Sequence, residues 1–232
     1  MHKFFDKYPE FVQTAKSGKK EMNSRWHAII NWHKEIYADA VVLDLGCQNG
    51  RLSHAALCAG AELTVGVDFD QQSIEAARTI LAKYQVPGTF RLIEQDLEVF
   101  LRAAQTSLNP GVVLCCGLLY HMHSPFHILL LISKLNPKHI VVDTEINQDE
   151  TPTLRYNHYG DKAFSKKAQL CFTCIPSRAW VTGALRTLGY TAEWFNWTTW
   201  IKDNADDQEA REGSQAYAQG NRVTLLATKV KL

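Results

Sequence analysis

The sequence of 232 residues lacks any apolar run close to the roughly 18 residues that a transmembrane helix needs. Its first six residues, MHKFFD, also lack the apolar segment and the cleavage site of a secretory signal. We therefore expect a cytoplasmic protein with no membrane partner.

The chain has no surplus of either charge, because 25 Lys and Arg balance 24 Asp and Glu to leave a formal net charge of +1. Domains that bind mainly by neutralising phosphates are strongly basic. The balance argues against nucleic acid as the main partner but leaves a local basic groove open. A hydrophobic content of 46% excludes a disordered chain, and the length suits one sizeable α/β domain.

The sequence has few cysteines and histidines at the spacings typical of metal ligands. Of six cysteines only Cys171 and Cys174 form a C-x-x-C pair, and no second pair accompanies it. His123 and His127 lie four residues apart, yet no carboxylate falls on the same face of a helix. We expect no metal site.

Short β-branched runs alternate with helical stretches in the first two thirds of the chain. The pattern predicts strands at 40–44, 63–68, 89–93, 111–116 and 139–143, with helices at 52–59, 71–84, 97–104 and 126–135. This alternation is typical of an α/β fold, in which helices cover both faces of a parallel sheet.

The segments around this unit are less regular. We expect a helical lead-in over 1–35, with Asn23 or Ser24 as an N-cap, before a domain over 36–232. Residues 146–175 are polar and aromatic and resemble an inserted cap. The predicted C-terminal part is a helix at 178–188 capped by Ser177, closing strands at 191–201 and 223–230, and a mobile loop at 202–221.

The clearest functional signal follows the first strand, where residues 44–50 read DLGCQNG. Ligands of doubly wound sheets bind beyond the carboxyl ends of the strands, and Gly46 and Gly50 let the backbone approach one closely. A dinucleotide fingerprint would need a further glycine where Gln48 stands, and Asp44 would repel a pyrophosphate. A ligand with a cationic amino group fits better.

This stretch resembles the first motif of the class I S-adenosylmethionine-dependent methyltransferases. The resemblance implies that Asp44 and the loop hold the methionine part of the cofactor, that Asp68 bonds the ribose hydroxyls and that Asp96 takes the adenine amino group. As alternatives, Asp44 and Asp96 cap helices and Asp68 forms a turn. The implied cofactor contacts are Asp44, Gly46, Cys47, Gln48, Gly50, Asp68, Phe69, Asp96, Leu97 and Cys116.

A second motif, G-x-L-Y-H-x-x-x-P over 117–125, follows the fourth strand. It resembles the subgroup that contains the tRNA wobble-uridine carboxymethyl-transferring enzymes and small-molecule-methylating relatives. S-R-W at 24–26 and C-I-P-S at 174–177 agree with this resemblance. Met122 and His123 stand where the wobble-uridine enzymes have arginines, and those enzymes also carry a longer N-terminal region.

Methyl transfer is an in-line displacement that depends largely on positioning. His121 is the candidate general base, because imidazole titrates near neutral pH, and Tyr120 is a candidate to orient the acceptor or bond the cofactor. As an alternative, Tyr120 packs under the cofactor and His121 caps the next helix. Candidate acceptor contacts, with sheet packing as the alternative for the tryptophan, are Glu145, Arg155, Tyr156, Tyr159 and Trp197.

We therefore predict a Rossmann-like sheet of seven mostly parallel strands, in the order 3-2-1-4-5-7-6 with the last strand antiparallel, and a small helical and aromatic cap. The predicted activity is transfer of a methyl group from S-adenosylmethionine, leaving S-adenosylhomocysteine, to an oxygen or nitrogen atom of a small acceptor. A tRNA wobble-uridine-modifying transferase is one alternative. A catalytically silent cofactor-binding subunit is another, which Gln48 keeps open. The sequence leaves the acceptor and the oligomeric state undetermined.

Overall fold

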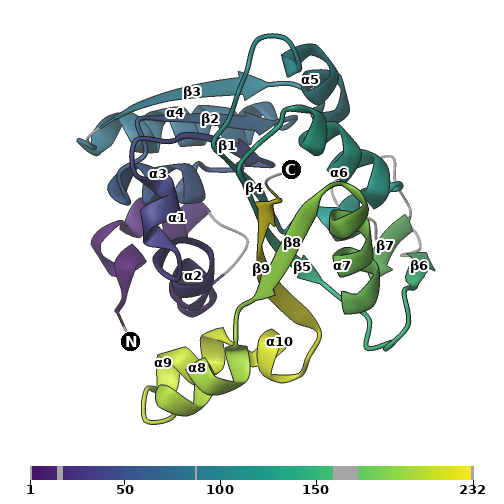
Figure 1. Cartoon of the computed structure of the whole chain (residues 1–232). Helices are drawn as coiled ribbons and strands as arrows, with labels where there is room; N and C mark the ends of the chain where they lie inside the picture. The colour runs from purple at the N-terminus through teal and green to yellow at the C-terminus, as the bar shows by residue number, and fades with distance from the viewer. Residues whose placement is uncertain (1, 15–17, 87, 159–171, 231–232) are drawn as a thin grey trace.

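A seven-stranded sheet in the order β3-β2-β1-β4-β5-β9-β8 forms the centre of the molecule (Figure 1). The structure is a computed structural model and describes residues 2–14, 18–86, 88–158 and 172–230. Strands β1 to β5 are parallel, and β9 runs antiparallel to both β5 and β8. The predicted fold class and strand order are thus confirmed. The strands are β1 (Val41–Leu45), β2 (Leu63–Asp68), β3 (Thr89–Glu94), β4 (Val112–Cys116), β5 (His139–Glu145), β8 (Tyr190–Trp194) and β9 (Arg222–Lys229).

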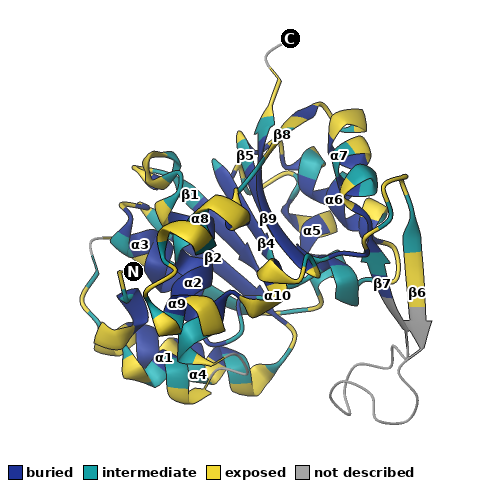
Figure 2. Cartoon of the chain, turned by 90° about the horizontal axis from the view of Figure 1, so that it is seen from below, coloured by how far each residue is buried: buried dark blue, intermediate teal, exposed yellow. Residues whose placement is uncertain are grey.

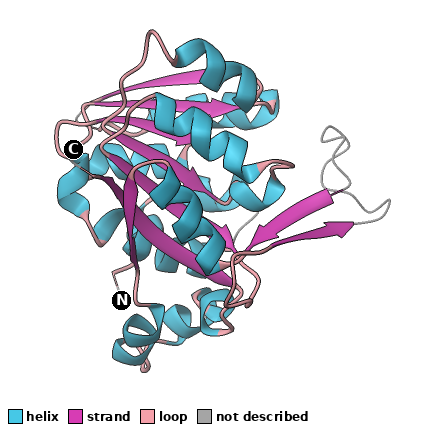
Figure 3. Cartoon of the chain, turned by 45° about the vertical axis from the view of Figure 1, so that its right-hand side comes forward, coloured by secondary structure: helices cyan, strands magenta, loops and turns pink. Residues whose placement is uncertain are grey.

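A separate antiparallel pair is formed by β6 (Leu154–His158) and β7 (Phe172–Pro176). It projects from the body of the molecule (Figure 3), and Figure 1 shows it beside α7. The pair lies within the segment that the sequence predicted as an inserted cap.

Helices cover both faces of the sheet (Figure 1). They are α1 (Pro9–Thr14), α2 (Lys19–Trp26), α3 (Arg51–Cys58), α4 (Gln71–Lys83), α5 (Leu97–Ala104), α6 (Pro125–Lys134), α7 (Arg178–Thr187), α8 (Trp197–Asp203), α9 (Gln208–Gly213) and α10 (Gln215–Ala218). Shorter helical turns are η1 (Phe4–Lys7), the π-helical η2 (His27–Asn31), η3 (Lys34–Tyr37) and η4 (Leu119–His121).

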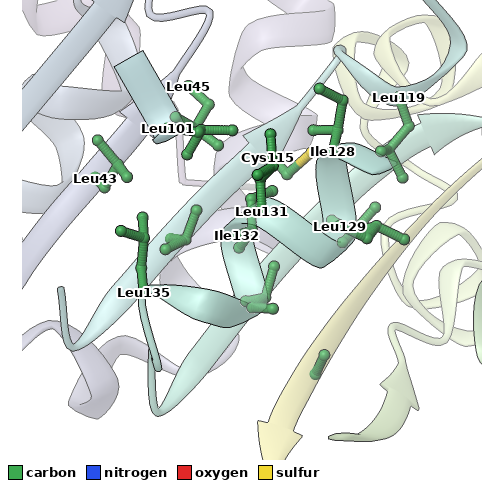
Figure 4. Packing of buried hydrophobic residues seen from close by; sticks show 14 of the residues in the cluster. Leu43, Leu45, Leu101, Cys115, Leu119, Ile128, Leu129, Leu131, Ile132 and Leu135 are labelled. Atoms are coloured by element: carbon green, nitrogen blue, oxygen red, sulfur yellow. The ribbon is translucent and has the colours of Figure 1, made fainter. Parts of the chain in front are cut away.

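Alternate residues of the central strands enter two separate cores, as the period of two in a strand requires. Leu43 and Leu45 of β1 face α5 and α6, where they join Leu101, Leu129 and other buried side chains (Figure 4). Val42, which precedes Leu43, belongs to the opposite core with residues of α1 to α4. Because both faces are covered, these strands are buried and apolar, as the dark central strands in Figure 2 show.

Three local predictions are wrong. Asn23 and Ser24 lie inside α2, because that helix begins at Lys19 after Gly18. The closing strand predicted at 191–201 ends at Trp194, since the Asn196 side chain accepts a hydrogen bond from Thr199 N and starts α8. The segment at 202–221, predicted as a mobile loop, contains α9 and α10.

The parallel strands bring several polar side chains to one edge of the sheet. Leu45 of β1 pairs with Val67 of β2 and with Cys115 of β4, so the residues that follow these strands lie side by side. No helix in the described part of the chain combines the length and apolar character that a membrane crossing requires.

Candidate active site

The loop between β1 and α3 has three residues with left-handed backbone. Gly46 and Gly50 have φ of +67° and +77°, and Gln48 has φ of +48°. The Gly46 and Cys47 amides both donate to the carbonyl oxygen of Val67, at 2.8 and 3.1 Å, so the loop is tied to β2. A side chain at Gly50 would press on Leu81 and Ala77 of α4, which explains why this position is glycine.

Asp44 lies near the end of β1 and is almost fully buried, with 2% of its surface exposed. Ser53 Oγ of α3 donates to its Oδ2 at 2.7 Å. Burial raises the pKa of Asp44 to about 6, although the Ser53 hydrogen bond and the charge of Arg51 act against this shift. A cationic group brought close to Asp44 would favour its ionised form.

Asp68 ends β2 and organises the loops around it. Its Oδ2 accepts from Gln48 N at 2.9 Å and its Oδ1 accepts from Asp70 N at 2.9 Å. Each carboxylate oxygen thus already accepts a hydrogen bond from a backbone amide, and each keeps a further lone pair for a ligand hydroxyl. The next residue, Phe69, is 53% exposed, which is unusual for a large apolar side chain beside buried strands.

Asp96 is the N-cap of α5, and its Oδ1 accepts from the amides of Glu98 and Val99 at 2.9 and 3.0 Å. The capping alternative therefore describes the contacts that Asp96 makes in this structure. Leu97 is the first residue of that helix and is half-buried. Both residues follow β3, next to the loop that carries Phe69.

The motif after β4 turns the chain sharply. Cys116, half-buried, ends the strand, and Gly117 has φ of +74° and donates its amide to Asp143 O at 2.7 Å. Tyr120 and His121 then lie in η4, half-buried, with ring centroids 4.1 Å apart. The arrangement brings both predicted catalytic side chains just past the carboxyl end of β4.

A buried ionic cluster lies beside this turn, and the sequence interpretation missed it. Asp143 of β5 is fully buried and accepts from Arg25 Nη2, Arg222 Nε, Tyr217 OH and Thr224 Oγ1, at 2.7 to 2.9 Å. Arg222 also lies over the Tyr120 ring, with its guanidinium carbon 5.5 Å from the centroid. The only sequence signal was that Asp143, like Asp44 and Asp68, is an acid at the end of an apolar strand run.

Arg51 was also missed, because it follows the glycine-rich motif. Its Nη1 donates to Gln48 Oε1 at 2.6 Å and to Asn49 Oδ1 at 3.2 Å. Burial and the nearby charge of Arg25 lower the pKa of Arg51 to about 10, so it stays cationic at neutral pH.

The predicted acceptor contacts do not form one cluster. Glu145, at the end of β5, has Oε1 3.9 Å from Nη1 of Arg222, the arginine that lies over the Tyr120 ring. Arg155 of β6 is exposed and paired with Asp149, and exposed Tyr156 donates to His123 O at 3.3 Å. Tyr159 and Cys171 lie outside the described residues. Trp197 is buried in α8, where it stacks on Tyr217 with centroids 3.7 Å apart and donates to Thr224 Oγ1 at 3.3 Å.

Comparison with known proteins identifies the family of this chain. A family model described as a methyltransferase domain matches residues 36–205, most of the chain, and the chain belongs to this family. Enzymes of the family use S-adenosylmethionine as methyl donor. The chain is therefore an S-adenosylmethionine-dependent methyltransferase, as the motifs after β1, β2 and β4 predicted.

Individual relatives are distant. A tRNA U34 carboxymethyltransferase of Psychrobacter sp. (strain PRwf-1) is 24% identical over 247 residues, covering 90% of this chain and 68% of that protein. The N-terminal domain of EvdMO1, solved with S-adenosylhomocysteine and D-fucose, has a TM-score of 0.62 at 14% identity, covering 94% of this chain and 85% of that one. The 1,6-didemethyltoxoflavin-N1-methyltransferase of Burkholderia thailandensis has a TM-score of 0.58 at 16% identity, covering 98% and 86%. These two structures support the fold.

Proposed function

We propose that this methyltransferase acts on an oxygen or nitrogen atom of a small acceptor. The observation that carries the proposal is the juxtaposition of the Gly46–Gly50 loop, Asp68 and the Tyr120–His121 turn, which follow three neighbouring parallel strands. The Gly46–Gly50 loop and Asp68 suit a nucleoside with an amino-acid tail. The Tyr120–His121 turn supplies a titratable side chain, His121, next to that ligand.

The residues at this edge fit S-adenosylmethionine. Asp68 has lone pairs for the ribose hydroxyls, and the exposed ring of Phe69 is an apolar surface that an adenine base would cover. Asp44 beside the loop suits the cationic amino group of the methionine part. When bound, the cofactor supplies an electrophilic methyl group on sulfur.

His121 is the proposed general base. Its imidazole would take the proton that the acceptor atom loses when it receives the methyl group. Tyr120, fixed against Arg222, is proposed to orient the acceptor. Glu145, which lies 3.9 Å from the same Arg222, is the second polar group proposed to contact the acceptor.

A small acceptor is favoured over tRNA by the pairing of surface cations. Lys166 and Lys167, two members of a possible basic patch, lie outside the described residues. Its members Lys19 and Lys20 form ion pairs with Asp6 and Glu212. Arg155 pairs with Asp149. Because each of these cations already has an acidic partner, this part of the surface offers little charge for a phosphate backbone. The relative named for tRNA U34 shares only 24% of aligned residues.

The first test is binding, measured by native mass spectrometry and calorimetry with S-adenosylmethionine and S-adenosylhomocysteine. A panel of small acceptors with hydroxyl, carboxyl or amino groups is then assayed for release of S-adenosylhomocysteine, with bulk tRNA in parallel. Turnover with a small acceptor supports the proposal. Methylation of tRNA alone, or no binding of either cofactor form, overturns it.

The role of His121 is tested with the acceptor that the panel identifies. His121→Gln should lower turnover about 10²- to 10⁴-fold, the usual contribution of a general base, and leave affinity for S-adenosylhomocysteine within twofold. His123→Gln, two residues away and exposed, is the matched control and should retain activity. A fully active His121→Gln enzyme would exclude the base.

A further inference from the structure

Gln48 occupies a strained position in the cofactor loop. Its φ of +48° is in the left-handed region, where a residue other than glycine is disfavoured and persists only if its surroundings hold it. Two contacts hold it here: its amide donates to Asp68 Oδ2 at 2.9 Å, and its side-chain Oε1 accepts from Arg51 Nη1 at 2.6 Å. The conformation thus directs the Gln48 side chain to a guanidinium.

The same guanidinium is fixed from a second side. Arg51 Nη1 also donates to Asn49 Oδ1 at 3.2 Å, and the Asn49 amide donates to Phe11 O and Thr14 Oγ1 of α1, both at 2.8 Å. Both oxygens that Arg51 meets are neutral amides. Its position is therefore defined, while its charge is left without compensation from these contacts.

Arg51 and Arg25 face a common space. The two side chains line a cavity of about 10 Å³, room for about one water molecule, between α3 and the N-terminal helices. Arg25 is neutralised by Asp143, with Nη2 2.9 Å from Oδ1, and its buried Nε has no hydrogen-bond partner among the described residues. Among the described residues no carboxylate forms an ion pair with Arg51, although the charges of Asp44 and Glu21 act on it from a greater distance. Two cations side by side, of which one has no carboxylate in direct contact, favour an incoming anion.

We propose that Arg51 binds the carboxylate at the amino-acid end of the cofactor, and that Gln48 is the positioning residue that aims it. This inference rests on the proposed function, because S-adenosylmethionine presents its carboxylate at the Gly46–Gly50 loop only if it lies there as described above. It also explains the departure from glycine at position 48, since glycine has no side chain to orient Arg51.

Asp44 and Arg51 together match the two charges at the amino-acid end of the cofactor. The cofactor's amino-acid end carries an ammonium and a carboxylate, and the loop is flanked by one buried acid, Asp44, and by Arg51, whose guanidinium forms no ion pair with a carboxylate of the described residues. A glutamine suits the aiming role because its neutral oxygen accepts from Arg51 without neutralising the charge.

The test compares two ligands that differ only in the carboxylate, S-adenosylmethionine and decarboxylated S-adenosylmethionine, by calorimetry. Arg51→Gln should weaken binding of S-adenosylmethionine at least tenfold and change binding of the decarboxylated ligand less than twofold. Arg102→Gln, which alters an exposed arginine paired with Glu98 on α5, is the matched control and should change neither. Unfolding midpoints of all variants are measured alongside.

The positioning role has a separate readout. Gln48→Glu keeps the oxygen that accepts from Arg51 but adds a charge that competes with the ligand carboxylate. Gln48→Glu should weaken binding of S-adenosylmethionine at least tenfold and leave binding of the decarboxylated ligand unchanged. Gln48→Met should weaken binding of S-adenosylmethionine about threefold, because it removes the oxygen that positions Arg51.

Equal losses for both ligands would show that Arg51 and Gln48 only support the loop, and would overturn the inference. If the unaltered protein binds neither ligand, the proposed function fails instead. If it binds both equally well, the cofactor is held without a carboxylate contact and the inference alone fails.

Discussion

Arg25 of α2 and Asp143 of β5, 118 residues apart in the chain, form a buried ion pair with Nη2 and Oδ1 2.9 Å apart. The pair attaches the N-terminal helices to the sheet next to the turn that carries Tyr120. Burial opposes the charge on Asp143, but Arg222 and Arg25 outweigh it and lower the pKa of Asp143 to about 2. The cluster is thus ionised at every pH at which the protein would be studied.

Removing the central charge should be costly. Asp143→Asn preserves the shape of the side chain but removes the buried carboxylate that both Arg25 and Arg222 contact at hydrogen-bond distance, which leaves them only Glu21 and Glu145 at 3.8 and 3.9 Å. We expect it to lower the free energy of unfolding by about 3–5 kcal/mol. Thr224→Val, which removes one neutral donor to the same carboxylate and also the acceptor of the Trp197 indole N–H, should cost about 1–2 kcal/mol. Urea unfolding of both variants measures the difference, and equal losses would contradict a charge-based role.

The sequence predicted most of the sheet because its strands are buried on both faces and therefore carry an unmistakable apolar signal. The run LTVGVD at 63–68 coincides with β2, and Ser177 caps α7 by accepting from Trp180 N at 3.1 Å. These features depend on local residues only. The glycine-rich loop was predictable for the same reason.

The C-terminal helices were not predictable, because their stability comes from contacts with distant segments. Residues 202–221 are mostly polar, yet Tyr217 reaches Asp143 and Gly213 of α9 lies against Lys20 of α2. No local sequence pattern around Gly213 predicts a contact with a residue almost 200 positions earlier in the chain. The same holds for Arg51, whose part in the site depends on the conformation of Gln48.

The contact of α9 with α2 gives a sharp prediction. A Cβ at Gly213 would lie 2.1 Å from the carbonyl oxygen of Lys20, which is backbone and cannot turn aside. Gly213→Ala must therefore separate the helices, and we expect it to cost about 1–3 kcal/mol, as overpacking does.

The matched control for this substitution is Gly183→Ala in α7. A Cβ there meets nothing within 4 Å, and alanine is the better helix former. We expect a gain of about 0.5–1 kcal/mol from thermal or urea unfolding. A neutral Gly213→Ala would show that α9 does not pack on α2 as described.

Asp44 should make stability and cofactor binding depend on pH. Its pKa is raised by burial from 3.8 to about 6, so the folded state holds a proton that the unfolded state releases. Asp44 therefore stabilises the fold as pH falls from about 6 toward 3.8, and above pH 6 its ionisation is a penalty of about 3 kcal/mol, at about 1.4 kcal/mol per pH unit.

Asp44→Asn should remove this dependence and raise the stability of the ligand-free protein at pH 8. A cationic cofactor amino group prefers ionised Asp44, so affinity for S-adenosylhomocysteine should decline below pH 6 in the unaltered protein only. Calorimetry between pH 5 and 8 measures both curves. A pH-independent affinity in the unaltered protein would separate Asp44 from the cofactor.

His54 of α3 acts in the opposite direction over the same pH range. It is 1% exposed among the rings of Phe4, Tyr8, Phe11 and Tyr84, and burial lowers its pKa from 6.5 to about 4. The unfolded state therefore takes up a proton that the folded state refuses, and stability is lost as pH falls from 6.5 toward 4.

The two effects are separated in the Asp44→Asn background, where the contribution of Asp44 is absent. There, the free energy of unfolding should fall by about 3 kcal/mol between pH 7 and 4, at about 1.4 kcal/mol per pH unit. Adding His54→Leu should flatten most of that decline, since leucine takes up no proton in either state. A decline that persists unchanged in the double variant would mean that other groups, and not the aromatic packing of the N-terminal helices around His54, set the acid sensitivity of the fold.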